Sequence, residues 1–554
     1  MQRPLSFSAR NRATDIATLK GETADLIVIG GGITGAGIAL DAASRGLKVV
    51  LLEKGDFASG TSSKSTKLIH GGLRYLKQFD FWLVKEVGSE RAIVHKLAPH
   101  LVLPEKMLLP LIEGGSYGKW LTSIGLKVYD ILAQVGGDDK RRMLEKKEAL
   151  QLEPLLPKKG LKGAGYYAEY RTDDSRLTIE NIKTALQYGA KALNYAEVTE
   201  FVYTPEGRVC GVGVRDCIGG ESFEVRSRHV ISAAGPWVDE LRSLNRSKKG
   251  KRLHLTKGVH LVFPYEKLPV KQSVYFDVPD GRMIFAIPRG RITYVGTTDT
   301  NYDSDKNEVY TDFADAIYLI SAVNNMFPTI ELEMSDIISS WAGLRPLIHE
   351  EGKSTSELSR KDEIFTSDSG LISIAGGKLT GYRKMAERVV NRIVSRVGEE
   401  DEGRELSDCQ TEEIPLCGSD FKKFKEVQKY ITRVLSKLER EGFEAYDAWY
   451  LVTNYGKQTE FILETFRKLP DADPFWRMIK AELQFALEHE MVHNPMDFLI
   501  RRTGRLYFDI ESVRKNLNQV AEECALQLKA DAQTQNGWVS EMEQILKQHS
   551  SFTL

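Results

Sequence analysis

Three glycines near the start of the chain have the spacing of a phosphate-binding turn. Gly30, Gly32 and Gly35 stand at G-x-G-x-x-G spacing between an apolar run at 26–29 and a helix-like segment at 34–44. In this pattern the first glycine allows a tight turn, the second lets the backbone approach a pyrophosphate, and the third lets the helix pack closely on the strand. Amides at the helix N-terminus then face the anion. The spacing predicts a dinucleotide site, and a glycine-rich turn that binds nothing is the alternative.

A carboxylate completes this unit. A second apolar run, at 49–52, ends at Glu53, where a side chain can accept hydrogen bonds from a ribose. The order of strand, turn, helix, strand and acid is that of a βαβ nucleotide-binding unit. We therefore expect the rest of the chain to be organised around residues 25–53.

The residues after Glu53 favour a flavin over a nicotinamide. Residues 55–76, GDFASGTSSKSTKLIHGGLRYL, form a small-residue and hydroxyl-rich loop that leads to His70 and Arg74. Such a loop can wrap a second phosphate and the edge of an isoalloxazine ring, whereas a nicotinamide site usually leaves the substrate to a separate domain. The expected cofactor is FAD.

Two later stretches are expected to reach the same dinucleotide. Residues 371–384, LISIAGGKLTGYRK, repeat the design of an apolar run, paired glycines and a helix start. A helix N-terminus there can face the pyrimidine end of a flavin, where negative charge builds up on reduction. Residues 230–241, VISAAGPWVDEL, read as a buried strand broken at Gly235 and Pro236, which is consistent with a third chain crossing near the cofactor.

Histidines and cationic side chains near these stretches are candidates for redox chemistry. Oxidation of an alcohol by a flavin needs an acceptor for the hydroxyl proton and cations for any anionic group of the substrate. The candidate acceptors are His70, His260 and His349, and the candidate cations are Arg74, Arg345, Arg360 and Lys378. A lone histidine is more often a hydrogen-bonded structural residue. His70 is better placed than most, because it lies between the phosphate loop and Arg74.

Residues 489–493, HEMVH, match a different motif, H-E-x-x-H. On a helix this spacing puts two imidazoles on one face to bind zinc, with the glutamate as a base. Asn494 and Pro495 end the helix immediately, however, and no extended zincin signature follows. We expect no metal site.

The elements that must position these residues point to an α/β chain. Strands are predicted at 196–203, 209–215 and 223–232 and again between 253 and 300, and a helix-like run leads to Ala192. Residues 78–150 are predicted to be mostly helical, with 125–135 as the clearest periodic piece, and to form part of a cap over the substrate. No repeat or low-complexity segment is visible, which argues against a solenoid.

The chain of 554 residues is longer than a usual single domain. We expect an N-terminal extension at 1–24, an FAD-binding domain at 25–400 and a helical C-terminal domain at 409–554, after a charged linker at 399–408. The first domain is predicted to be Rossmann-like, with insertions at about 78–150 and 250–340 that form an antiparallel-sheet substrate domain.

Composition excludes several other classes. The formal charge of −1 gives no global attraction to nucleic acid or to an acidic membrane. Five cysteines without a C-x-x-C pair suggest reduced thiols in the cytoplasm. The first twenty residues lack the apolar segment of a secretory signal, and no run of 18 apolar residues occurs, so any membrane contact must be peripheral.

Local basic surfaces are the candidates for such contact. From Asp420 onward apolar residues share one face of a predicted helix, namely Phe421, Phe424, Val427, Ile431, Leu435 and Leu438. Lysines and an arginine occupy much of the rest, so this helix either lies on an anionic bilayer or, as is commoner, packs on its neighbours. A second candidate is the cluster Arg246, Lys248, Lys249, Lys251 and Arg252. It lacks the interleaved aromatic residues of a nucleic-acid surface.

Over essentially its whole length the sequence resembles the FAD-dependent glycerol-3-phosphate dehydrogenases of the glycine oxidase-like flavoprotein superfamily. The motifs that carry the resemblance are, in order, GGGITGAGIALDAASRG, TSSKSTKLIHGGLRYL, YRTDDSRL, AAGPWVD, TKGVHLVF, GTTDT, WAGLRPL and GGKLTGYRK. One departure is the triplet Ala233-Ala234-Gly235, which stands where a Thr-containing ATG triplet is commoner; it should matter little, because backbone approach is the requirement.

The resemblance implies site residues. The substrate pocket of the family maps onto His70, Arg74, Tyr75, His260, Arg345, Arg360 and Lys378. The cofactor-binding residues expected are Gly30, Gly32, Ile33, Thr34, Gly35, Glu53, Thr61, Ser62, Ser63, Lys67, Leu68, Ile69, His70, Gly71, Val198, Ala234, Gly235, Trp237, Gly376, Lys378, Leu379 and Thr380. The sequence does not select the residue that takes the proton.

The implied reaction is oxidation of sn-glycerol 3-phosphate to dihydroxyacetone phosphate by hydride transfer to FAD, with a membrane quinone as the next electron acceptor. The expected location is the cytoplasm, peripherally at the inner face of the cell membrane, and a homodimer is possible. Two alternatives stay open: an oxidase that gives hydrogen peroxide from the same pocket, and a flavin-containing RNA-modifying or RNA-binding protein that uses basic C-terminal helices.

Overall fold

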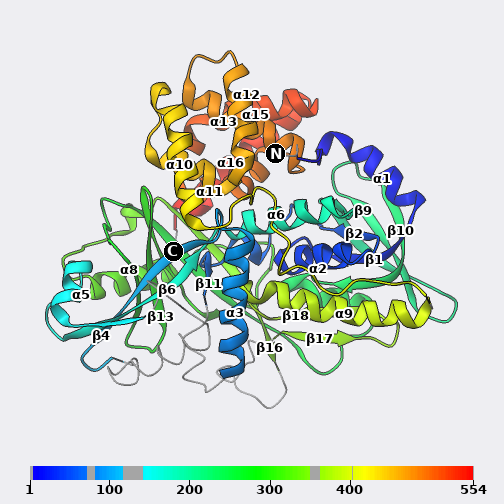
Figure 1. Ribbon diagram of the computed structural model, residues 1–554, viewed down its shortest axis with the longest axis horizontal. Coiled ribbons are helices and arrows are strands. Elements are labelled where there is room, and N and C mark those ends of the chain that lie inside the picture. Colours follow the sequence, from blue (N-terminus) through cyan, green and yellow to red (C-terminus); the bar gives the residue numbers. More distant parts are fainter. Residues whose placement is uncertain (1–3, 71–80, 116–140, 350–361, 402, 553–554) are drawn as a thin grey trace.

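A computed structural model describes residues 4–70, 81–115, 141–349, 362–401 and 403–552 of the chain. Two large sheets lie side by side, and a group of helices from the C-terminal part packs above them (Figure 1). The sheet around β1, β2 and β10 carries the nucleotide-binding unit, and the sheet around β4, β6 and β13 forms the other half of the base. The predicted α/β class, with a Rossmann-like domain, a second sheet and a helical C-terminal part, is confirmed.

The first sheet has a parallel centre. Its strand order is β17-β18-β10-β1-β2-β7, and β9 joins β10 and β8 at its side as an antiparallel extension. The strands are β1 (Thr23–Ile29), β2 (Val49–Leu52), β7 (Lys191–Leu193), β8 (Ala196–Tyr203), β9 (Val209–Asp216), β10 (Ser222–Ser232), β17 (Glu363–Thr366) and β18 (Ile372–Ala375). The apolar runs of β1 and β2 are buried throughout because helices cover the sheet. Among these helices α2 (Ile33–Ser44) packs on both α6 (Asp174–Gln187) and α9 (Tyr382–Glu400).

The second sheet is mostly antiparallel, as predicted. Its order is β15-β11-β14-β13-β12-β4-β6-β3, with β16 paired to β11 and β5 to β6. The strands are β3 (Leu68–Ile69), β4 (Leu103–Ile112), β5 (Arg142–Leu144), β6 (Leu161–Arg171), β11 (Arg252–Pro264), β12 (Ser273–Asp277), β13 (Met283–Arg289), β14 (Ile292–Gly296), β15 (Thr300–Asn301) and β16 (Ser339–His349). The other helices that precede the C-terminal helices are α3 (Phe81–Leu97), α5 (Lys146–Leu152), α7 (Val238–Leu244) and α8 (Phe313–Met326).

Alternation along β11 sends side chains to two different layers. Val259, Leu261 and Phe263 join the core that contains α8, whereas Val262 joins the core beneath the C-terminal helices. His260 lies between these residues and therefore faces the same side as Val262, which is where the candidate site lies.

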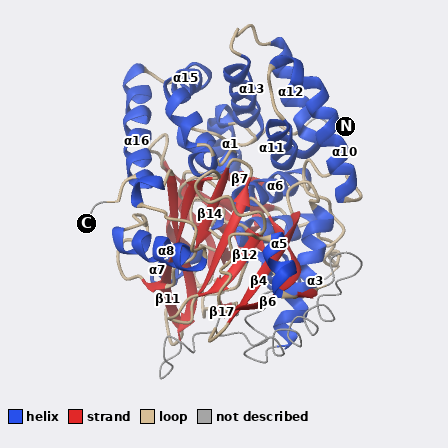
Figure 2. Cartoon of the chain, turned by 90° about the vertical axis from the view of Figure 1, so that its left-hand side faces the viewer, coloured by secondary structure: helices blue, strands red, loops and turns tan. Residues whose placement is uncertain are grey.

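The C-terminal helices cover one face of the second sheet (Figure 2). They are α10 (Phe424–Leu438), α11 (Ala445–Tyr455), α12 (Thr459–Lys468), α13 (Pro474–His489), α14 (Arg505–Phe508), α15 (Ile510–Leu528) and α16 (Ala532–Ser550), with a π-helical turn at Asp497–Arg502. The N-terminal segment reaches the same layer, because the Phe7 amide donates to Glu488 O and the Met491 amide to Phe7 O. Helix α1 (Arg12–Gly21) follows this segment and leads into β1.

The structure corrects two sequence-based predictions. The described part of residues 78–150 is not helical throughout: Phe81–Leu97 forms α3, but Leu103–Ile112 forms β4, which pairs with β6 and β12 inside the second sheet. The predicted helix at 125–135 lies outside the described residues. The helix expected to reach Ala192 ends at Gln187, since Gly189 takes a left-handed conformation (φ 88°) and β7 begins at Lys191.

The amphipathic helix predicted after Asp420 is α10, and its apolar face packs on its neighbours. Val427, Val434 and Leu438 are fully buried in a core shared with α11, α12 and α13. The commoner of the two expectations is therefore confirmed. No helix in the described part of the chain is long and apolar enough to cross a membrane.

Candidate active site

A cavity of about 660 Å³ opens at the carboxyl ends of the parallel strands. It is lined by the turn after β1, by Glu53 after β2, by residues 233–237 after β10 and by residues 376–380 after β18. Ligands in open α/β sheets bind in the crevice outside these strand ends. The second sheet closes the other side of the cavity with residues of β11 and β16.

The glycines of the first turn are required by close backbone contacts. A Cβ at Gly35 would lie 1.8 Å from Gly30 O, and one at Gly30, where φ is 113°, would lie 2.6 Å from Ala233 O. Gly32 differs, because its Cβ would meet only Ser62, whose Oγ is 3.0 Å away. The space beyond Gly32 is thus cavity. Gly32 is the N-cap residue of α2 and has no side chain that could accept hydrogen bonds from the first-turn amides.

Glu53 is held in one orientation by backbone amides. Its Oε2 accepts from Gly31 N at 2.7 Å, and its Oε1 accepts from Gly55 N at 2.9 Å. Burial raises the pKa of this carboxyl. Glu53 also lines the cavity.

The hydroxyl-rich loop is anchored from beneath. Lys67 Nζ lies 2.5 Å from Asp174 Oδ1 and donates to Ser63 O at 3.0 Å, and both ion-pair partners are buried. Ser62 Oγ accepts from Ile33 N at 2.9 Å, which joins the loop to the start of α2. Lys67 therefore holds the loop in place, while Ser62 is exposed to the cavity.

His260, on β11 of the second sheet, lines the cavity. Its ring stacks on Trp341 of β16 with a centroid distance of 4.8 Å, and a Cβ at Gly296 of β14 would lie 2.1 Å from the ring. Its Nε2 lies 2.9 Å from Thr66 Oγ1. Burial, together with the positive charge of Arg345, holds the pKa of this imidazole well below its usual range. His260 is therefore neutral at physiological pH.

Arg345 is on β16 and lies beside His260, which is on the neighbouring strand β11. Its Nη2 donates to Thr297 Oγ1 at 2.8 Å and its Nη1 to Thr298 O at 3.1 Å, with Asp299 Oδ1 at 3.3 Å. A Cβ at Gly258 of β11 would lie 2.3 Å from Nη2, so this glycine makes room for the guanidinium. The Arg345 side chain is 29% exposed and lines the cavity.

His70 is joined by hydrogen bonds to Thr380, two residues after Lys378, and all three residues line the cavity. Thr380 Oγ1 accepts from the His70 amide and lies 3.1 Å from His70 O. Gly376 and Gly377 both have φ near 80° (79° and 78°), a conformation that delivers Lys378 to the cavity at the start of a helical turn. Proton acceptors and cations from four separated stretches thus surround one space.

The structure brings most of the predicted site residues together. The cavity is lined by Gly30, Gly32, Ile33, Thr34, Glu53, Thr61, Ser62, Leu68, His70, Val198, Ala234, Gly235, Trp237, His260, Arg345, Gly376, Lys378, Leu379 and Thr380. Four predicted residues lie just behind the lining, namely Gly35, Ser63, Lys67 and Ile69. The predicted residues Gly71, Arg74, Tyr75 and Arg360 lie outside the described residues. His349 lies at the end of β16, opposite Arg252 and away from the cavity lining.

Several lining residues were not predicted from the sequence, among them Thr66 and Lys64. Thr66 positions His260, and Lys64 reaches the cavity next to it; burial and the positive charge of Arg501 lower the pKa of Lys64 to about 8. Both stand inside the quoted motif TSSKSTKLIHGG, so proximity to His70 was the available signal. Nothing in the local pattern distinguishes them from other loop residues.

The H-E-x-x-H motif has a structural role instead of a metal-binding one. Helix α13 ends at His489 and Met491 has a positive φ of 51°, so the two histidines do not share a helix face. His489 Nδ1 lies 2.8 Å from Leu5 O, and His493 Nε2 lies 3.1 Å from Asn194 Oδ1. No cluster suitable for a metal ion occurs in the part of the chain that the structure covers.

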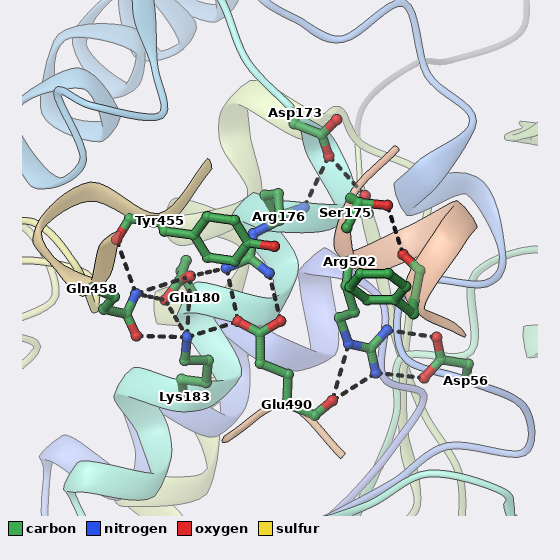
Figure 3. A network of polar contacts seen from close by, with 12 residues as sticks. Asp56, Asp173, Ser175, Arg176, Glu180, Lys183, Tyr455, Gln458, Glu490 and Arg502 are labelled. Carbon is green, nitrogen blue, oxygen red and sulfur yellow. Dashed lines mark hydrogen bonds and ion pairs between the residues drawn. The ribbon is translucent and has the colours of Figure 1, made fainter. Parts of the chain in front are cut away.

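Glu490 of this motif is the centre of a buried ion-pair network (Figure 3). It binds Arg176 at 2.8 and 2.9 Å and Lys183 at 3.0 Å, both from α6. Its backbone oxygen accepts from Arg502, whose guanidinium also binds Asp56. The motif therefore joins the C-terminal helices to α6 and to the loop after Glu53.

The residues present fit an FAD molecule. The glycine turn and the N-terminus of α2 leave space for a pyrophosphate, Glu53 is aimed at a ribose, and a Cβ at Gly235 would meet nothing within 4 Å although this glycine lines the cavity. The paired glycines before Lys378 and the helix that follows them suit the pyrimidine end of the ring.

Comparison with known protein families agrees with this reading of the cavity. Residues 25–383 match the family described as FAD dependent oxidoreductase. Residues 409–535 match the family described as the C-terminal domain of alpha-glycerophosphate oxidase. The two matches together span most of the chain.

The chain is similar to named proteins over nearly its full length. It is 49% identical to the aerobic glycerol-3-phosphate dehydrogenase of Bacillus subtilis, in a match that covers 98% of each chain. It is 47% identical to the enzyme of the same name from Staphylococcus haemolyticus, in a match that covers 97% of each chain. A solved structure of the glycerol-3-phosphate dehydrogenase from Bacillus halodurans complexed with FAD superposes with a TM-score of 0.84 at 41% identity, covering 99% of each chain. An L-alpha-glycerophosphate oxidase from Mycoplasma pneumoniae with FAD bound shares the fold, with a TM-score of 0.55 at 21% identity over 70% of this chain and 96% of that one.

Proposed function

The chain belongs to the aerobic glycerol-3-phosphate dehydrogenase family of FAD-dependent oxidoreductases, and from this premise we propose that it oxidises sn-glycerol 3-phosphate to dihydroxyacetone phosphate and passes the electrons to a membrane quinone. The observation that carries the proposal is that neutral His260 and the cations Arg345 and Lys378 line one cavity, with Arg345 close enough to His260 to lower its pKa. These are the groups that oxidation of a phosphorylated alcohol needs.

Each residue has a role that follows from its contacts. Arg345 presents a fixed guanidinium fork, which matches a phosphate group better than an ammonium does. His260 is neutral and fixed by Trp341 and Thr66, so it can accept the hydroxyl proton of the substrate. His70 also lines the cavity and is the second candidate to accept the hydroxyl proton. FAD, when bound, supplies the acceptor for the hydride.

The walls around His260 are closely packed. Trp341 is fully buried and donates its Nε1 hydrogen to Ser65 O at 3.0 Å, which fixes the floor of the cavity under the imidazole. Gly343 lets β16 approach the phosphate loop, since a Cβ there would lie 2.6 Å from Lys64 O. A dry site strengthens the attraction of the cations for a phosphate.

Anaerobic mixing with glycerol 3-phosphate tests the first half of the proposal. Prompt bleaching of the flavin absorbance is expected. A flavin that stays yellow would contradict the proposed oxidation of glycerol 3-phosphate. Reoxidation of the bleached enzyme then separates the acceptors. We expect a quinone analogue to reoxidise the flavin faster than oxygen does. Hydrogen peroxide formed stoichiometrically at the rate of turnover would instead assign the oxidase reaction. The oxidase is the alternative to test because residues 409–535 match a domain named after alpha-glycerophosphate oxidase.

Delivery of electrons to a membrane quinone calls for peripheral contact with the bilayer. The basic cluster at 246–252 offers such a surface next to the exposed side chain of Leu244, although Lys248, Lys249 and Lys251 each lie within 4 Å of an acidic partner. Attraction to anionic lipid should therefore be moderate and sensitive to salt. Part of the protein is expected to sediment with anionic vesicles at low salt, and sedimentation with neutral vesicles to the same extent would exclude this electrostatic contact.

A further inference from the structure

The N-terminal end of the chain lies against the C-terminal helices (Figure 1). Residues 5–12, which end at the first residue of α1, are bound there through their backbone. The Phe7 amide donates to Glu488 O at 2.9 Å, and the Met491 amide donates to Phe7 O at 2.8 Å. Both backbone groups of Phe7 are therefore used, and its main chain is fixed between the end of α13 and the H-E-x-x-H motif. We call residues 5–12 the N-terminal strap.

The last residue of the strap is bound to the other side of the nucleotide-binding unit. The buried Arg12 guanidinium pairs with Asp216 at 2.7 and 2.9 Å and donates to Asn194 O and Tyr195 O, each at 2.8 Å. Asn194 in turn donates its amide hydrogen to Asp56 Oδ1 at 2.9 Å. Arg12 thus fixes the residues that hold the loop after β2.

The ring of Phe7 reaches the glycine turn through one other ring. Phe7 stacks on Phe57 with ring centroids 5.8 Å apart, and both side chains are buried. Phe57 packs directly on the turn, since a Cβ at Gly31 would lie 2.6 Å from Phe57 Cδ1 and 2.8 Å from Glu53 Cβ. Gly31 is hydrogen-bonded on both sides, because its amide donates to Glu53 Oε2 at 2.7 Å and its oxygen accepts from the Ala58 amide at 3.0 Å.

The strap supports this turn from outside the FAD cavity. Among the described residues, the lining of the cavity begins at Ile29, so the strap contributes no part of it. A segment that does not touch a ligand changes its affinity only by changing which conformation of the site is populated. The stack of Phe7 on Phe57 supplies such a link, because a densely packed interior transmits the loss of a buried ring to its neighbours.

We propose that the N-terminal strap is a positioning element for FAD, which holds the glycine turn and Glu53 in the conformation that retains the cofactor. Phe7 acts through the ring of Phe57, and Arg12 acts through Asn194 and Asp56. Without the Phe7 ring, Phe57 gains space to move and the backbone of the turn is less ordered, so binding of FAD costs additional ordering entropy. The inference concerns FAD alone and does not depend on the substrate or on the electron acceptor.

Release of FAD from the diluted holoenzyme, followed by flavin fluorescence, tests the proposal. Phe7→Ala should raise the rate of release about tenfold. The matched control is Phe443→Ala, in the core of the C-terminal helices, because the two phenylalanines are 6% and 7% exposed and Phe443 contacts Phe466 at a similar centroid distance of 5.9 Å. This control should lose comparable stability and release FAD at the parent rate. Phe7→Leu, which refills most of the volume, should restore a rate close to that of the parent protein.

Heating separates the loss of cofactor from unfolding. In the parent protein and in Phe443→Ala, free flavin fluorescence should appear together with the loss of helical circular dichroism. In Phe7→Ala the flavin should be released at a lower temperature than the helices unfold. This difference is not expected from a general loss of stability, which shifts both transitions together.

A milder variant decides the matter if Phe7→Ala does not fold. Ser8→Ala removes one buried hydrogen bond of the strap, from Ser8 Oγ to Leu487 O at 2.7 Å, and should raise the rate of FAD release about two- to threefold. Release at the parent rate from the folded strap variants overturns the inference. An equal acceleration in Phe443→Ala overturns it as well, because the effect would then be one of stability alone.

Discussion

Arg502 of the C-terminal helices binds both carboxylate oxygens of Asp56, at 2.7 and 2.8 Å, three residues after the ribose-binding candidate Glu53 (Figure 3). Both side chains are fully buried. Arg501 adds a second ion pair to Asp56. The C-terminal helical region is thus fastened to the loop that follows Glu53 at the FAD cavity.

Asp56→Asn should destabilise the protein by about 3 to 5 kcal/mol, because it removes the counter-ion of buried Arg502 and one of the two carboxylate partners of Arg501. The free energy of unfolding is measured by denaturant titration, and FAD loss during dilution is measured alongside it. The control is Glu221→Gln, whose partner Lys20 and own side chain are about half exposed. It should cost less than about 1 kcal/mol. Equal effects of the two substitutions would show that the Asp56 pairs contribute nothing special.

Acid should release the same fastening. The guanidinium groups of Arg502 and Arg501 hold the pKa of Asp56 far below its usual range, and Arg176 and Lys183 do the same for Glu490. A carboxyl with a depressed pKa in the folded state contributes stability that is fully present above its unfolded pKa, about 4, and is lost as the pH falls further. The stability difference between the parent protein and Asp56→Asn should therefore be constant only above about pH 7, where Asp497, whose pKa burial and the Asp56 carboxylate raise to about 6, is also ionised, and it should shrink below about pH 4. A difference that is flat down to pH 3 would contradict it.

Local patterns made the nucleotide-binding half predictable. The glycine spacing, the buried apolar runs and the acid at position 53 lie within one stretch of the chain, and their structure follows from short-range geometry. Strand β4 was missed because its identity depends on pairing with β6 and β12, which are distant in sequence. Its run of leucines between two prolines gives no clear period by itself.

The reacting end of the site shows the same limit. Gly258 and Gly296 make room for Arg345 and His260, but this role exists only because β11 lies between β14 and β16 in a particular register. Such cross-strand glycines carry no motif. The ion pairs of Asp56 and Glu490 with residues more than three hundred positions away were likewise invisible in the sequence.

Gly32→Val should abolish FAD binding. A branched side chain at this position enters the space left for the pyrophosphate, since its Cβ meets only Ser62 among the protein atoms. The flavin content of the purified variant is read from its absorbance. The matched control is Gly21→Ala at the end of α1, where a Cβ meets nothing within 4 Å; it should retain full FAD. Full occupancy in Gly32→Val would show that the cofactor phosphates lie elsewhere.

Metal analysis should find no stoichiometric zinc in the purified protein. His489 is hydrogen-bonded to the backbone of Leu5. Because α13 ends at His489, this residue and His493 do not lie on one face of a helix, as two zinc ligands of this motif would. His489→Ala should leave turnover nearly unchanged, and His493→Ala should act through stability, because its imidazole is buried against Asn194 and Tyr195. One zinc ion per chain that disappears with either histidine would overturn this assignment.

Arg345→Lys should impair the use of a phosphorylated substrate specifically. The guanidinium is held by Thr297 and Thr298 and lies over Gly258, so its fork is fixed toward the cavity, and a single ammonium cannot reproduce two parallel hydrogen bonds to phosphate. The expected loss is about 1 to 3 kcal/mol of productive binding, which corresponds to roughly a ten- to hundredfold fall in kcat/KM for glycerol 3-phosphate.

The comparison with unphosphorylated glycerol decides the role of Arg345. If the side chain holds the phosphate, the weak activity toward glycerol should hardly change, and Arg252→Lys, an exposed arginine at the start of β11, should affect neither substrate. An equal fall for both substrates would place Arg345 at the flavin or at the reacting hydroxyl. No fall for either would mean that its hydrogen bonds and its ion pair with Asp299 only hold the strands together. Because the phosphate is the sole difference between the two substrates, the ratio of the two kcat/KM values isolates its contact from any general damage to the site.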